Sequence, residues 1–164
     1  KNLGGYINTV TGREMLLWNG GCHVHGQFSL AKILAIKAEH PEAKILVHPE
    51  CPAPVQKVAD VIGSTAGLLN FAIKDDATEF IVATESGILH EMKKACPQKN
   101  FIPAPPEDGS CACNECNYMK LVTLQKIYNS LKHEWPCIEV DAEVAKKAVV
   151  SIERMLEISE KLGL

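Results

Sequence analysis

Residues 44–50, Lys44-Ile45-Leu46-Val47-His48-Pro49-Glu50 (KILVHPE), are the stretch that decides the fold. The short apolar run predicts a buried strand at residues 44–48, which Pro49 stops because proline cannot donate to a strand ladder. The polar pair His48 and Glu50 therefore comes at the carboxyl end of this strand. A similar stretch, EFIVATE at residues 79–85, also predicts a buried strand with a glutamate at its end.

Predicted helices and strands alternate outward from this stretch. Short apolar runs predict two further strands, at residues 14–18 and 100–102. Apolar spacing and turn residues predict the intervening helices, at residues 28–39, 54–61, 63–74 and 86–95. Such alternation predicts an α/β fold, a three-layer α/β/α unit with a four-stranded parallel sheet.

The pattern changes after the fourth predicted strand. Two helices are predicted by apolar side chains that recur on one face, namely Leu121, Leu124, Tyr128 and Leu131 on one and Ala145, Val149, Ile152 and Leu156 on the other. The second helix is expected to end near Gly163. We expect residues 1–106 to form the α/β unit and residues 107–164 to form a cysteine-containing loop and closing helices.

Composition excludes several classes of protein. With 164 residues, 46% of them hydrophobic, the chain can bury an ordinary core. A net charge of −3 provides no basic surface for nucleic acid. No apolar run is long enough to span a membrane and no signal peptide begins the chain, so we expect a cytoplasmic protein. There the 7 cysteines stay reduced, which makes them candidate metal ligands, catalytic groups or buried side chains.

Polar residues gather where the predicted strands end. Parallel strands place their carboxyl ends at one edge of the sheet, where ligands bind. An imidazole close to a carboxylate can move protons near neutral pH. Serine and threonine at a helix start serve as an N-cap or bind an anion. We expect one pocket to be shared by Cys22, His25, His48, Glu50, Ser64 and Thr65.

A cysteine cluster, SCACNECNYMK, occupies residues 110–120. Its spacing differs from the paired knuckles of zinc ribbons and from ferredoxin motifs. Three alternatives remain open from spacing alone. The three thiols could hold zinc with a fourth ligand, one thiol could hold a cluster beside an oxidisable pair, or the cluster could bind no metal.

Several ordered segments together resemble the quinolinate synthase family. They are residues 1–4 (KNLG), 17–25 (LWNGGCHVH), 45–52 (ILVHPECP), 60–65 (DVIGST), 80–88 (FIVATESGI) and 113–119 (CNECNYM). The resemblance covers nearly the whole chain. Members of that family are longer at the N-terminus, so the chain is expected to be a C-terminal portion, in keeping with its start at Lys1.

The resemblance implies an activity and a fold. The family condenses iminoaspartate (iminosuccinate) with dihydroxyacetone phosphate to give quinolinate, phosphate and water in de novo NAD biosynthesis, a transferase reaction. It uses a [4Fe–4S] cluster held by three cysteines, which leaves one iron open. Three related α/β/α units around a pseudo-threefold axis are expected, with the closing helices of this chain packing on an absent N-terminal domain.

The resemblance also implies roles for particular residues. Cys22 and Cys116 match the second and third cluster ligands, and the first would come from the missing N-terminal portion. Glu50 is expected to be the general base, and His25 and His48 are expected to be catalytic. The expected substrate-binding residues are His48, Pro49, Glu50, Ser64 and Thr65.

Two expectations follow for the chain by itself. Cys111 and Cys113 become accessory thiols, and the chain alone is expected to be catalytically inactive. The alternative from another class is a non-enzymatic zinc or iron–sulfur structural module, closed by Cys111, Cys113, Cys116 and Cys22. A closed site leaves no coordination position for a substrate.

Overall fold

The computed structural model describes residues 1–108 and 114–163. The chain forms two compact units, residues 1–120 and 121–164. The domain division expected from the sequence, 1–106 and 107–164, stays a prediction. Among the helices in the described ranges, none combines the length and apolar character needed to cross a bilayer.

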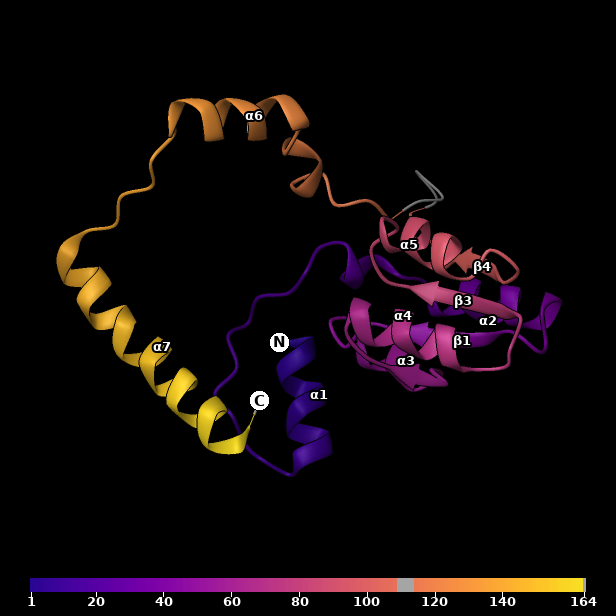
Figure 1. Cartoon of the computed structure of the whole chain (residues 1–164). Coiled ribbons are helices and arrows are strands. Elements are labelled where there is room, and N and C mark those ends of the chain that lie inside the picture. The colour runs from indigo at the N-terminus through magenta and orange to yellow at the C-terminus, as the bar shows by residue number, and fades with distance from the viewer. Residues whose placement is uncertain (109–113, 164) are drawn as a thin grey trace. The chain divides into compact units, whose positions relative to one another are not determined.

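A parallel sheet forms the centre of the first unit (Figure 1). Its strands are β1 (Lys44–Val47), β2 (Val61–Ile62), β3 (Glu79–Ala83) and β4 (Asn100–Pro103). They lie in the order β2-β1-β3-β4, and every neighbouring pair is parallel. The predicted α/β fold with a four-stranded parallel sheet is therefore confirmed.

Helices cover both faces of this sheet, because its central strands alternate apolar side chains between two cores. On one face α2 (Leu30–Glu39) and α3 (Ala53–Gln56) cover Ile45 and Ile81. On the other face α4 (Thr65–Lys74) and α5 (Ile88–Ala95) cover a core that includes the following side chains: Leu46, Phe80, Val82 and Phe101. Parallel strands buried on both faces are continuously apolar, as KILV and EFIVA are.

One predicted strand is wrong. Residues 14–18 form no strand, and the side chains of Leu16 and Trp18 are 104% and 88% exposed. An apolar run has β-propensity, but it becomes a strand only beside a partner, and no described strand pairs with this one. The fourth strand is instead β2, whose two residues pair with β1. The chain begins with a helix that was not predicted, α1 (Asn2–Thr11).

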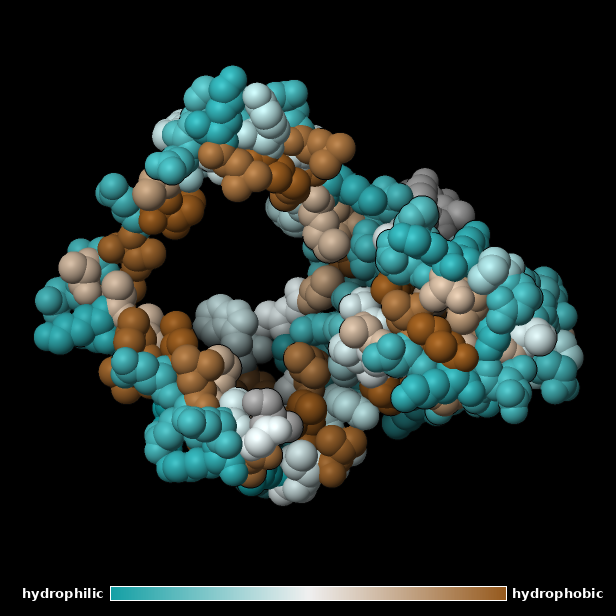
Figure 2. Space-filling view, in the orientation of Figure 1, coloured by the Kyte–Doolittle hydropathy of each residue, from teal (hydrophilic) through white to brown (hydrophobic). Residues whose placement is uncertain are grey.

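The second unit is helical. It contains α6 (Leu124–His133) and α7 (Ala142–Leu162), and the 3₁₀ turn η2 (Met119–Leu121) lies where the two units join. The side chain of Asp141 caps α7, and Gly163 ends it at φ 69°, as predicted. Apolar side chains gather along one side of each helix and stay exposed (Figure 2).

Candidate functional site

The turn that follows β1 is held by backbone and side-chain hydrogen bonds. The His48 N–H donates to the Ala83 carbonyl at 3.1 Å, which continues the sheet by one residue. The Glu50 N–H donates to His48 Nδ1 at 3.1 Å, and the Gln56 amide donates to the Pro49 carbonyl at 2.9 Å. Since His48 Nδ1 accepts a hydrogen bond, the proton of the neutral ring lies on Nε2.

His25 lies at the same edge of the sheet, but it does not follow a strand as predicted. It begins the 3₁₀ turn η1 (His25–Gln27), which follows a loop and no strand. Its ring stacks on His48 with centroids 4.3 Å apart, and its Nε2 lies 3.0 Å from Thr84 Oγ1. Its buried Nδ1 has no hydrogen-bond partner among the residues that the structure describes.

Both imidazoles are kept neutral. Burial, and then the neighbouring His48, lowers the pKa of His25 to about 4. Burial also lowers the pKa of His48, and the charge of Glu50 acts in the opposite direction. A neutral imidazole holds one proton and one lone pair. Near pH 7 the pair can therefore donate and accept hydrogen bonds at defined atoms without carrying charge.

The start of α4 supplies the polar groups of the next loop. The Ser64 side chain caps the helix by accepting the Gly67 N–H at 3.1 Å, so its N-cap role is confirmed. Thr65 lines a cavity of about 530 Å³. The other residues lining it are His25, Thr84, Glu85, Gly87, Ile88 and Met119.

The expected common pocket is therefore observed in part. His25 and Thr65 line the cavity, and His48 stacks on His25. Glu50 interacts electrostatically with His48, and its own carbonyl accepts the Asn2 side-chain amide at 2.8 Å.

Thr84, Glu85 and Met119 were not predicted as site residues. Thr84 and Glu85 come directly after β3, so treating every strand end alike would have found them. Met119 carries no such signal, because it lies near the end of the cysteine-cluster stretch and follows no strand directly.

Cys22 and Cys116 lie on loops that contact each other. Both are free, partly buried thiols. The rings of His23 and Tyr118, each close in sequence to one of these cysteines, meet edge to face with centroids 5.4 Å apart. Cys111 and Cys113 lie outside the described residues.

Thiolates are the usual ligands of iron–sulfur clusters, so the donor chemistry of Cys22 and Cys116 suits two corners of such a cluster. Within residues 1–108 and 114–163, no group of three or more histidine, cysteine or acidic side chains is arranged to hold a metal ion.

The other free cysteines are placed for packing or lie at the surface. Cys51 and Cys96 belong to the two cores of the sheet. The Cys51 thiol donates to the Ala83 carbonyl at 3.4 Å, and burial raises its pKa to about 12. A thiol with so high a pKa is a poor ligand or nucleophile.

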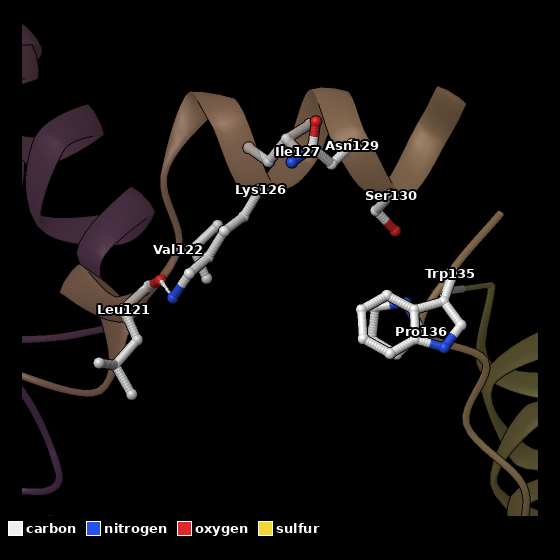
Figure 3. Close-up of a pocket in the computed structure, with 8 residues that line it drawn as sticks. All are labelled: Leu121, Val122, Lys126, Ile127, Asn129, Ser130, Trp135 and Pro136. Carbon is white, nitrogen blue, oxygen red and sulfur yellow. Dashed lines mark hydrogen bonds between the residues drawn. The ribbon is translucent and has the colours of Figure 1, made fainter. Parts of the chain in front are cut away.

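A second hollow, of about 560 Å³, lies within the second unit (Figure 3). It is lined by Leu121, Val122, Lys126, Ile127, Asn129, Ser130, Trp135 and Pro136. The one cation of this lining, the Lys126 ammonium, donates to the Leu121 carbonyl at 2.7 Å. The lining brings together no group able to move protons at neutral pH, so the cavity beside His25 is the candidate site.

Comparisons with known proteins agree on one family. The model of the quinolinate synthetase A protein family matches residues 1–157. The quinolinate synthase of Microcystis aeruginosa is 51% identical over 97% of this chain and 50% of that protein. The quinolinate synthases of Chloroherpeton thalassium and a Synechococcus species are 49% and 48% identical over 98% and 97% of this chain, and half of each protein. The chain thus spans about half the length of these relatives, and it belongs to the quinolinate synthetase A protein family.

Proposed function

We propose that the chain is part of a quinolinate synthase. In the proposed reaction, iminoaspartate (iminosuccinate) condenses with dihydroxyacetone phosphate to give quinolinate, phosphate and water, a transferase step of de novo NAD biosynthesis in the cytoplasm. The observation that carries the proposal is the pair of stacked, neutral histidines beside the cavity that Thr65 lines. This pair occurs in a chain whose sequence is 51% identical to that of a quinolinate synthase.

His48 and Glu50 carry the proton transfers in this proposal. Condensation and ring closure require a proton to leave a carbon next to a carbonyl or imine. The Glu50 carboxylate takes that proton as the general base. His48 stays neutral near pH 7 and keeps its proton on Nε2. Its Nε2–H therefore donates a hydrogen bond to the substrate oxygen that becomes negative during the reaction.

His25 and the start of α4 hold the substrates. The buried Nδ1 of His25 has no hydrogen-bond partner within the described part of the chain, so it is a polar atom that a bound substrate can satisfy. Ser64 and Thr65 lie at the N-terminus of a helix, where backbone N–H groups and the helix dipole favour a carboxylate or phosphate. Pro49 fixes the turn between His48 and Glu50.

Cys22 and Cys116 would hold a [4Fe–4S] cluster together with a cysteine from the N-terminal portion of the same enzyme. When bound, the cluster supplies an open iron that acts as a Lewis acid in the dehydration steps. The support is the thiolate chemistry of both residues and the His23–Tyr118 contact between their loops. With one ligand absent, the chain alone is inactive.

To test this proposal, the chain is combined with the remaining half of the Microcystis aeruginosa relative and quinolinate formation is measured. We expect quinolinate from both substrates in the anaerobic, iron-loaded combination and none from the chain alone. Glu50→Gln should abolish product, whereas Glu42→Gln, an exposed glutamate on the loop before β1, should retain it. No quinolinate from the combination, while the whole relative is active, would refute the proposal.

The structural zinc or iron–sulfur module remains the second candidate, because Cys111, Cys113 and Cys116 lie within six positions of the sequence. The double variant Cys111→Ser/Cys113→Ser separates the two functions. A closed structural site should lose its metal, whereas the enzyme should keep its cluster. Cys137→Ser, at an exposed cysteine of the second unit, is the matched control.

A further inference from the structure

Glu85 joins two segments that are far apart in the sequence. It follows Thr84 at the carboxyl end of β3. Its Oε2 accepts the Gly87 N–H at 2.8 Å, within its own turn, and its Oε1 accepts the Cys116 N–H at 3.3 Å, from 31 residues along the chain. Each oxygen of the carboxylate is therefore used by a different backbone donor.

Neighbouring contacts support the same attachment. The Ser86 N–H donates to the Asn114 carbonyl at 3.2 Å. Asn114 is 7% exposed, and its side-chain amide donates to the Ala104 carbonyl at 3.4 Å. The segment before Cys116 is thus bonded to the turns after β3 and β4, on the side of the sheet where the candidate cavity lies.

We propose that Glu85 is a positioning residue that holds the Cys116 loop at the carboxyl end of β3 and so fixes the place of the Cys116 thiol. The importance of that place rests on the proposed function, in which Cys116 is a cluster ligand. A carboxylate suits this task because each of its two oxygens can accept a strong, charge-assisted bond from an N–H.

Replacing Glu85 by glutamine or by alanine removes different numbers of its two hydrogen bonds. Glutamine offers one carbonyl oxygen, and its amide nitrogen would face an N–H donor, so Glu85→Gln loses one of the two bonds. Glu85→Ala loses both. Glu115→Gln is the matched control, since it removes the same charge next to Cys116 from a carboxylate that is 48% exposed and lies 3.8 Å from Lys120.

Amide hydrogen exchange on the 164-residue chain without metal tests the anchor. We expect Glu85→Ala to speed exchange of the Cys116 amide by about tenfold or more, as loss of a charge-assisted bond predicts, with Glu85→Gln between it and wild type. Glu115→Gln should exchange like wild type. Unchanged exchange at the core amides of Leu46 and Val82 in every variant shows that the sheet remains folded.

Wild-type exchange at Cys116 in Glu85→Ala would overturn the proposal. If that same protein also lost quinolinate formation, Glu85 would act as an acid–base group in the reaction and not as an anchor. The iron content of the wild-type chain combined with the remaining half of the Microcystis aeruginosa relative distinguishes failure of the Glu85 anchor from failure of the proposed function. Faster exchange in Glu85→Ala together with an iron-free wild type supports the anchor and refutes the cluster.

Discussion

The buried histidine pair predicts a specific dependence of stability on pH. In the unfolded chain His25 takes up a proton near pH 6.5, but in the folded chain burial delays protonation to about pH 4. The unfolded state therefore binds more protons between these values, and folding stability must fall as the pH falls. The contribution of neutral His25 to the free energy of unfolding is fully present above pH 6.5. It is lost progressively as the pH falls to about 4, and it falls no further below that pH.

The magnitude follows from the same values. A pKa lowered from 6.5 to about 4 in a side chain that is 8% exposed corresponds to roughly 3 kcal/mol over the whole range. Between pH 7 and pH 5 the loss attributable to His25 is roughly 2 kcal/mol of unfolding free energy. His48 adds a loss in the same direction, since burial lowers its pKa too.

The variant His25→Gln isolates this contribution, because glutamine does not titrate and its amide can take the place of Nε2 beside Thr84. Urea unfolding of the metal-free chain, followed by the NMR amide signals of β1 and β3, gives the free energy at pH 7 and pH 5. Wild type should lose roughly 2 kcal/mol more than His25→Gln over this interval. His90→Gln, at a histidine that is 82% exposed, is the control and should behave like wild type.

Equal losses in wild type and His25→Gln would refute the reasoning. An NMR titration of the His25 ring measures its pKa directly and so tests the same point independently. If the ring signals of His25 titrate near pH 6.5, burial does not keep the ring neutral, and the role assigned to the stacked pair fails.

Two further predictions test the core and the start of α4. Phe80→Ala removes a fully buried ring that stacks on Phe101 at 5.5 Å, and should cost about 3–5 kcal/mol in urea unfolding, whereas Leu16→Ala, at an exposed side chain, should cost almost nothing. Ser64→Ala and Ser29→Ala each remove an N-cap and should each cost about 1 kcal/mol. Only Ser64→Ala should weaken binding of inorganic phosphate, which is followed by amide shifts at the start of α4. Equal phosphate affinity in both variants would show that the Ser64 hydroxyl takes no part in anion binding.

The sequence predicted the sheet well where strands are buried on both faces. The runs around residues 45–47 and 80–83 are continuously apolar, and both form central strands. The run at residues 14–18 has a similar apolar character, yet its side chains are exposed. Composition indicates what could be buried, whereas pairing depends on which strand lies alongside. The two residues of β2 are too few for any periodicity to show.

The site was predicted to the extent that parallel topology constrains it. Residues after β1 and before α4 were expected at one edge of the sheet, and the contacts of His48 and the cavity beside Thr65 agree. His25 was expected to follow a strand, but it follows a loop, and its role in the site stays a prediction. The position of Glu85 at the end of β3 could have marked it as a site residue, but its bond to the Cys116 N–H could not be predicted, because no side-chain motif indicates a backbone partner.

The iron, sulfide and zinc content of protein purified without oxygen tests the central claim most directly. The chain would be measured alone and with the remaining half of the Microcystis aeruginosa relative, as wild type and as Cys116→Ser. The shared-cluster account predicts iron with matching sulfide that appears or rises in the combination and is lost in Cys116→Ser. Zinc bound tightly to the chain alone, with no iron in either preparation, would contradict it.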